Sequence, residues 1–294
     1  MGICRVIINP SSGKANIMQA VPFLKESFEG KYEAVEFSFT EKGGDALLFA
    51  KQACEAGYEA IICAGGDGTV REVVNGLMQG GAETTLGILP TGTVNDVARS
   101  LSIPLELTAA VRFLLEAKHQ KMDVGKVNQE YFISLIAIGG IPEAIHRVSI
   151  AAKTKWGILS YLGNGAWYAL RQKSFFLTAL LNGEKRRVRT SLVVVSLQNS
   201  VAGMKKFFEG ATPFDGRMRI MLYPPFKFFG AAKYVSKIIL GTIGRDKNIT
   251  VVPFETAELQ VEEELPITID GDQAGQFPLH IEIIPQAISV YASK

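Results

Sequence analysis

Short apolar runs alternate with amphipathic segments along the chain up to about residue 125. The apolar runs, rich in β-branched residues, predict strands at Cys4–Ile8, Ala34–Phe39, Ala60–Cys63 and Thr85–Leu89. Helical periodicity follows them at Ile17–Phe28, Asp45–Ala56, Thr69–Met78, Val94–Leu101 and Leu107–Ala117. Such alternation is typical of βαβ units on a mostly parallel sheet. Because ligands bind beyond the carboxyl ends of such strands, a site is expected in the loops that follow them.

The pattern changes after Asp123, where strand-like runs dominate. They lie at Tyr131–Ile138, Val188–Leu197, Arg217–Leu222, Ala257–Val261 and Ile267–Ile269. Asn182-Gly183 is a strong hairpin signal, and the main helical candidates are Gly157–Leu170 and Phe229–Leu240. We therefore expect an α/β domain over residues 1–125 and a β-rich, antiparallel domain over residues 126–285.

Composition narrows the class of protein. The 294 residues are 47% hydrophobic, which excludes a disordered chain, and 31 basic against 29 acidic residues leave a net charge of only +2. That balance argues against a nucleic-acid partner. Cysteine and histidine spacings suit neither a disulfide framework nor zinc. With no signal-peptide pattern and no transmembrane run of ~18 apolar residues, we expect a cytoplasmic protein.

The loop Asn9-Pro10-Ser11-Ser12-Gly13 follows the first predicted strand. It resembles a phosphate loop but is not a Walker A motif, which requires Gly at position 8 and Ser or Thr at position 15. Taken alone, it is more simply a strand-to-helix turn.

The loop Gly65-Gly66-Asp67-Gly68-Thr69 follows a buried-looking strand and opens a helix. Its glycines let backbone N–H groups approach a phosphate, and the helix dipole favours negative charge there. Arg71 replaces the third glycine of the dinucleotide fingerprint. Asp67 would repel phosphates unless a cation lies between them, so it points to a magnesium-bound nucleotide. The alternative is a glycine-rich turn in which Asp67 caps the helix.

The third loop runs from Leu89 to Asp96, and its hydroxyls and amide suit ribose or phosphate contacts. Alone it could be only a helix cap with turn residues. Three such loops at successive strand ends predict a ligand cleft.

These motifs resemble the diacylglycerol kinase catalytic-domain family. The resemblance rests on Gly65–Thr69 with Glu72 and Asn75–Leu77, followed by Gly92–Arg99. Pro213–Gly216 and Asp270–Asp272 fall where the family places later motifs. The family includes bacterial lipid kinases and sphingosine kinases, with NAD kinases as more distant relatives.

The resemblance implies a nucleotide-binding α/β domain and an antiparallel β-sandwich domain, with the active site in the cleft between them. It also implies that the last strand, about residues 286–294, returns to the first domain. Asn95 and Asp96 are the implied substrate-binding residues. The implied ATP-binding residues are Asn9, Pro10, Ser11, Ser12, Gly13, Thr40, Gly65, Gly66, Asp67, Gly68, Thr69, Val70, Arg71, Glu72 and Thr93.

By the same resemblance, acids from the second domain complete the catalytic site. A lipid hydroxyl is a poor nucleophile, so a carboxylate must accept its proton during attack on the γ-phosphoryl group. Asp270 or Asp272 is the implied base, and Asp67 would position the magnesium nucleotide. Without the resemblance, Asp270-Gly271-Asp272 reads as an ordinary tight turn.

Two positions depart from the family pattern. Asp272 stands where the family has Glu, which shortens the reach of the carboxylate. The second departure lies in a segment that forms a structural magnesium site in bacterial members of the family. That segment has two acidic residues in the family pattern, and here Asp215 is the first while Arg219 replaces the second. Asp215 with the carbonyls of Thr212 and Arg217 could still hold a hydrated ion, or the Arg219 guanidinium could take the cation's place.

The resulting prediction is an ATP- and Mg²⁺-dependent lipid kinase with a diacylglycerol-like or phosphatidylglycerol-like acceptor. Its lipid partner would be met by peripheral contact at the inner membrane face, and a homodimer is left open. Two alternatives are an NAD-kinase-like small-molecule kinase and a nucleotide-binding regulatory protein with impaired catalysis.

Overall fold

The computed structural model describes residues 2–13, 17–139, 174–199, 208, 210–225, 237 and 246–293. Contacts divide the chain into two units, Met1–Val124 with Pro285–Lys294, and Gly125–Ile284. The predicted helix Gly157–Leu170 lies outside the described residues, as does Phe229–Leu240 apart from Lys237.

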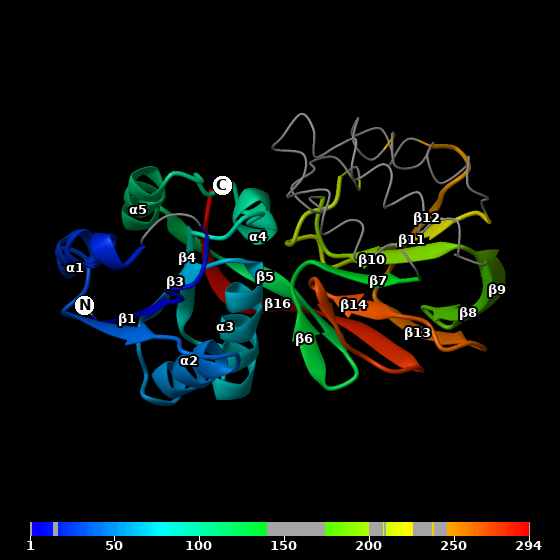
Figure 1. The fold of residues 1–294 in the computed structure, drawn as a ribbon, viewed down its shortest axis with the longest axis horizontal. Coiled ribbons are helices and arrows are strands. Elements are labelled where there is room, and N and C mark those ends of the chain that lie inside the picture. Colours follow the sequence, from blue (N-terminus) through cyan, green and yellow to red (C-terminus); the bar gives the residue numbers. More distant parts are fainter. Residues whose placement is uncertain are drawn as a thin grey trace. The chain divides into compact units, whose positions relative to one another are not determined.

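The first unit is built on a parallel sheet (Figure 1). Its strands, in spatial order, are β2 (Ala34–Phe39), β1 (Ile3–Ile8), β3 (Ala60–Gly65), β4 (Thr85–Pro90) and the end of β16 (Leu279–Ala292). Every residue of β3 and β4 is buried, which explains their unbroken apolar sequence. Strand β16 joins this sheet beside β4, where Val290 pairs in parallel with Leu86.

Helices cover both faces of the parallel sheet. They are α1 (Val21–Glu29, after the 3₁₀ turn Ile17–Ala20), α2 (Asp45–Glu55), α3 (Asp67–Gly80), α4 (Asp96–Ser100) and α5 (Leu107–Glu116). Figure 1 shows α1 and α5 on one side of the sheet and α2 and α3 on the other. The strand order is β2-β1-β3-β4, so the chain turns back on itself after β2. The helices that follow β1 and β3 therefore cover opposite faces of the sheet. Ligands of open α/β sheets bind at such a switch point.

The second unit contains two antiparallel sheets. One joins β16 to β13 (Thr256–Val261), β8 (Phe175–Leu181) and β9 (Glu184–Thr190). The other has the order β12 (Thr250–Phe254), β11 (Met218–Tyr223), β10 (Leu192–Ser196), β7 (Leu135–Ile138), β14 (Ile267–Ile269) and β15 (Asp272–Gln273). Strand β5 (Lys118–Val127) pairs with β16 and with β6 (Glu130–Phe132).

Alternate side chains from both antiparallel sheets form one buried apolar core, with Leu177 and Leu259 from one sheet and Val193, Val195 and Ile220 from the other. This period-two burial is typical of a β-sandwich. The predicted fold class, a mostly parallel α/β part followed by an antiparallel β part, is confirmed. None of the helices in the described ranges is long and apolar enough to cross a membrane.

Two predicted strands are each divided in two by the structure. Tyr131–Ile138 becomes β6 and β7, because the backbone N–H groups at the break turn toward the Asp270 carboxylate. Val188–Leu197 becomes β9 and β10, which belong to different sheets. The hydroxyl of Thr190 donates to the carbonyl oxygens of Leu192 and Tyr223 at this corner. Single polar residues such as Ser134 and Ser191 lie at the two breaks, and such residues also occur inside strands, so periodicity alone did not locate the breaks.

Candidate active site

The three predicted loops lie together at the carboxyl ends of β1, β3 and β4. The Asn9 N–H donates to the carbonyl of Ala64 at 2.9 Å, and the Thr91 N–H donates to that of Gly65 at 3.2 Å. A Cβ atom added to Gly92 would overlap the Cα atom of Gly66. The second and third loops therefore touch through their backbones, and only glycine permits that approach.

The first loop packs against the third through Gly13. Gly13 has φ +74°, and a Cβ atom there would overlap the carbonyl oxygen of Thr91. The hydroxyls of Ser12 and Thr91 share a hydrogen bond of 2.5 Å. Hydrogen bonds and close backbone contacts thus hold all three loops together in one continuous surface.

A cavity of about 230 Å³ opens at this surface. Its lining combines five residues predicted to bind the nucleotide, Asn9, Ser11, Thr40, Thr69 and Glu72, with three that were not predicted, Glu41, Lys42 and Gly43. The unpredicted residues form the turn after β2. Asp45 holds this turn, because its Oδ2 accepts the backbone N–H groups of Glu41 at 2.8 Å and Lys42 at 2.9 Å. These two bonds lower the pKa of Asp45.

Hydrogen bonds fix the polar side chains in the cavity. Asn9 Nδ2 donates to Thr69 Oγ1 at 3.0 Å, while Asn9 Oδ1 accepts the Ser11 N–H at 3.0 Å. Glu72 Oε2 accepts the N–H of Ala46 at 3.2 Å, which ties α3 to the start of α2. The cavity is therefore bounded by groups with defined orientation.

Helix α3 begins beside the cavity, at Asp67. The N-terminus of a helix presents N–H groups that no helical carbonyl accepts, together with a partial positive charge. A Cβ atom on Gly68 would meet nothing within 4 Å beyond its own helix, so space adjoins this end. Open space, N–H donors and positive potential are what a phosphate needs.

Asp67 is the first residue of α3 and follows the N-cap Gly66, which has no side chain to cap the helix. Asp67 Oδ1 accepts the N–H of Val97 at 3.2 Å. The carboxylate therefore links the start of α3 to the start of α4.

The other predicted nucleotide-binding residues lie on the same loops or on the first turn of α3 without lining the cavity. They are Pro10, Ser12, Gly13, Gly65, Gly66, Asp67, Gly68, Val70, Arg71 and Thr93. Val70 is 1% exposed, so its side chain belongs to the core. Pro10, Gly68 and Thr93 are exposed.

Asn95 and Asp96, the predicted substrate residues, are buried where α4 begins. Asn95 has φ +56°, and its Nδ2 donates to the carbonyl of Gly92 at 2.8 Å. Its Oδ1 is buried and has no hydrogen-bond partner among the described residues. Because a buried acceptor without a donor is costly, this oxygen suits a ligand hydroxyl or water.

In the second unit, Asp270 and Asp272 have different environments. Asp270 (φ +49°) and Gly271 (φ +97°) are the central residues of the hairpin between β14 and β15, as a type I′ turn requires. Asp270 Oδ1 accepts the N–H groups of Ser134 at 2.8 Å and Leu135 at 2.9 Å, and Oδ2 accepts that of Ile133 at 2.9 Å. Asp272 is exposed. The turn is therefore anchored through Asp270 and presents Asp272.

The three predicted metal ligands lie around an ion pair. Asp215 Oδ2 is 2.6 Å from Arg219 Nη2, and Asp215 Oδ1 accepts the N–H of Arg217 at 3.1 Å. Thr212 lies in the same loop and is exposed. In the described part of the chain, no group of three or more His, Cys, Asp or Glu side chains could hold a metal ion.

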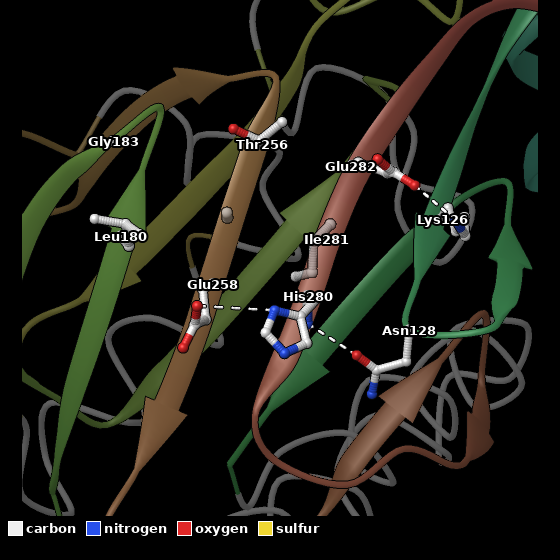
Figure 2. Close-up of a pocket in the computed structure, with 10 residues that line it drawn as sticks. Lys126, Asn128, Leu180, Gly183, Thr256, Glu258, His280, Ile281 and Glu282 are labelled. Atoms are coloured by element: carbon white, nitrogen blue, oxygen red, sulfur yellow. Dashed lines mark hydrogen bonds and ion pairs between the residues drawn. The ribbon is translucent and has the colours of Figure 1, made fainter.

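A second hollow, about 340 Å³ in volume, lies on the outer face of a sheet in the second unit (Figure 2). Its polar side chains contact one another: Lys126 Nζ lies 2.7 Å from Glu282 Oε1, and His280 Nδ1 lies 3.8 Å from Glu258 Oε2. It contains none of the predicted site residues. The cavity at the three loops is therefore the better candidate site.

A mostly parallel α/β sheet with three loops gathered at its carboxyl edge, followed by an antiparallel β part, defines a class of proteins with two structural parts. Residues 4–127 match the diacylglycerol kinase catalytic domain. Residues 140–292 match the YegS C-terminal NAD kinase beta sandwich-like domain. The chain belongs to the diacylglycerol kinase catalytic-domain family of lipid kinases, and the resemblance noted from its motifs is confirmed.

Relatives match the chain over nearly its full length. A Streptococcus pneumoniae protein that bears a lipid-kinase name is 32% identical over 98% of this chain and 97% of its own. A Staphylococcus carnosus protein named diacylglycerol kinase is 30% identical over 99% of this chain and 95% of its own. A crystal structure of a Bacillus anthracis diacylglycerol kinase superimposes with a TM-score of 0.82 at 23% identity, covering 99% of this chain and 97% of that one. This last likeness concerns the fold alone.

Proposed function

We propose that this protein transfers the γ-phosphoryl group of ATP to the hydroxyl of a diacylglycerol-like or phosphatidylglycerol-like lipid. The proposal rests above all on the cavity beside the start of α3, which five of the predicted nucleotide-binding residues line. Membership of the lipid kinase family supports the class of acceptor.

The phosphates of the nucleotide would lie against the start of α3. The N–H groups and dipole of the helix offset their negative charge, and the open space at Gly68 admits them. Asn9, Thr40 and Thr69 would donate hydrogen bonds from the cavity. Magnesium arrives with ATP as part of the substrate, and it offsets the repulsion between the phosphates and the nearby Asp67 carboxylate.

Asp272 is the proposed general base. The lipid oxygen forms a bond to the γ-phosphorus while the bond from that phosphorus to the β,γ-bridging oxygen breaks. The hydroxyl proton passes to the Asp272 carboxylate, and ADP leaves. Asp270 is proposed as a positioning residue, because its two oxygens already accept three backbone N–H groups.

Asn95 is the proposed contact for a substrate hydroxyl. Its Nδ2 is held by the carbonyl of Gly92, so the amide orientation is defined. The buried Oδ1 can then accept a hydrogen bond from the ribose or from the acceptor. Either contact would satisfy the buried oxygen.

The test is a transfer assay with γ-labelled ATP against diacylglycerol, phosphatidylglycerol, ceramide and sphingoid bases in mixed micelles, with NAD as a further acceptor. We expect label in one lipid class, lost in Asp272→Asn and kept in Glu263→Gln, which neutralises an exposed acid of the same unit. Label in NAD alone would favour an NAD-kinase-like enzyme. ATP binding with no transfer to any acceptor would favour a regulatory protein.

A further inference from the structure

The family resemblance implies a structural divalent cation at residues 212–219, and the donors present here do not suit one. Asp215 contributes a carboxylate, but the second acid of the pattern is Arg219. The Arg219 guanidinium contacts the Asp215 carboxylate at 2.6 Å and reaches the carbonyl oxygen of Gly210 at 3.5 Å. A cation belonging to the protein thus already lies against the carboxylate that a metal would use.

We propose that the Arg219 guanidinium is a built-in substitute for the structural divalent cation, so that this part of the protein is stable without metal. The proposal concerns folding of the second unit and does not depend on the proposed phosphoryl transfer. It also assigns a role to Arg219, which the proposed reaction does not use.

The geometry of the loop supports this substitution. Asp215 Oδ1 accepts the Arg217 N–H at 3.1 Å across Gly216, whose φ is +67°. Asp215 Oδ2 is then held by Arg219 at the start of β11, so one carboxylate joins the turn to the strand.

Burial gives this ion pair more weight than an ordinary surface pair. The Arg219 and Asp215 side chains are only 15% and 26% exposed. Removing one partner of this partly buried pair leaves the other charge without its counter-charge, which should destabilise the loop. A divalent ion brought to Asp215 would also meet the positive charge of Arg219 at contact distance, which disfavours its binding.

The pair also lies in register with the anchored turn that presents Asp272. Arg219 on β11 pairs with Ser196 on β10, and Ser196 pairs with Leu135 on β7. The carbonyl of Leu135 accepts the Asp270 N–H at 2.8 Å. A row of paired residues across the sheet thus connects Arg219 to Asp270. An ion pair that stiffens β11 at Arg219 therefore also supports the turn that contains Asp270.

The first test uses the full-length wild-type protein without nucleotide, with thermal unfolding followed in EDTA and then in millimolar magnesium. We expect the same melting temperature in both. A magnesium-specific rise, absent with sodium chloride of equal ionic strength, would overturn the proposal, because a ligand of the native state raises its melting temperature.

The second test restores the missing acid. Arg219→Asp should melt several degrees lower than wild type in EDTA and recover when magnesium or calcium is added, because two carboxylates then face the loop carbonyls. Arg186→Asp is the matched control, since the same change on the exposed edge strand β9 removes only a surface pair with Glu184. It should show no metal response.

A third variant keeps the proposal testable should Arg219→Asp fail to fold. Arg219→Gln removes the charge without adding a ligand, so it should melt below wild type whether or not magnesium is present. A melting temperature equal to that of wild type would show that the ion pair does not hold the loop. A folded Arg219→Asp protein that ignores both metals would show that the guanidinium does not occupy a cation's position.

Discussion

The carboxylate of Asp270 accepts the backbone N–H of Ser134 at 2.8 Å, which joins the β14–β15 hairpin to the segment between β6 and β7. Ile133 and Leu135 donate to the same carboxylate. With these donors engaged, Asp270 is suited to holding the turn, and the exposed Asp272 is suited to accepting a proton. The two acids of the Asp270-Gly271-Asp272 turn thus have separable roles that mutation can distinguish.

Asp272→Asn should remove the proposed general base while nearly preserving the shape of the side chain. We expect kcat to fall by about 10²–10⁴-fold, the usual contribution of such a group. The melting temperature and the affinity for ATP should stay at wild-type values, because Asp272 is exposed and lies in the second unit. Asp272→Glu should preserve or raise turnover, since it restores the acid of the family pattern. Wild-type turnover in Asp272→Asn would place the base elsewhere.

Asp270→Asn should act through structure. An amide has one oxygen where the carboxylate has two, and its NH₂ group would face a backbone N–H donor. Hydrogen bonds to charged groups contribute ~1.5–3 kcal/mol each, so the free energy of unfolding should fall by about 2 kcal/mol or more. Urea unfolding measures this directly. Unchanged stability with a large loss of kcat would reverse the two roles.

Much of the first unit could be predicted from sequence, because its signals are local. Strands such as Ala34–Phe39 coincide with their apolar runs, and Gly65–Thr69 opens a helix as expected. The Asn182-Gly183 hairpin is confirmed as well, with φ of +47° and +87°. Each of these features depends on residues that are neighbours in the chain.

The anchoring role of Asp270 could not be predicted, because its N–H donors lie 135 to 137 residues away. The contribution of Glu41 and Lys42 to the cavity was likewise missed, since only the fold brings the β2 turn beside Asn9. For Arg219, sequence left two alternatives, and the ion pair with Asp215 favours one of them. The features that could not be predicted therefore depend mostly on contacts between segments that are distant in the chain.

Two glycine variants should separate phosphate binding from loop packing. Gly68→Val places its side chain in open space at the start of α3, so we expect a large loss of ATP affinity with most of the stability kept. Valine has a higher helix propensity than glycine, so the substitution should not weaken α3 itself. Isothermal titration with ATP and thermal unfolding measure the two effects.

Gly92→Ala is the counterpart to this variant. Its Cβ atom would overlap the Gly66 Cα atom, so stability should fall together with ATP affinity. Wild-type ATP affinity in a folded Gly68→Val protein would contradict the assignment of phosphates to the start of α3.

Asn95→Gly should test the buried amide without straining the backbone. Glycine adopts the φ of +56° found at Asn95, whereas alanine would not do so freely. The variant loses both the bond to the Gly92 carbonyl and the buried Oδ1 acceptor. We expect KM to rise for ATP or for the lipid, and the substrate affected identifies the hydroxyl that Oδ1 accepts. Unchanged KM for both would remove Asn95 from the binding site.

Acid stability should depend on the ion pair that the buried Asp246 forms with the partly exposed Lys237. Lys237 Nζ lies 2.6 Å from Asp246 Oδ2, and the backbone N–H of Asn248 donates to Oδ1 at 3.0 Å. Lys237 first, then the Asn248 N–H, lower the pKa of Asp246 from 3.8 to about 2. Because the folded pKa is the lower one, the stabilisation is present above the unfolded pKa and is lost as the pH falls through the folded pKa.

The shift corresponds to a contribution of about 2 kcal/mol at neutral pH, most of which should be gone at about pH 2. Urea unfolding at several pH values between about 6 and 2 measures the loss. Other carboxylates titrate in the same range, so the informative quantity is the difference between wild type and Asp246→Asn. That difference should shrink by about 2 kcal/mol on acidification, because the variant has no proton to gain at this position. A difference that stays constant across the range would mean that Lys237 does not hold Asp246 ionised in the folded protein.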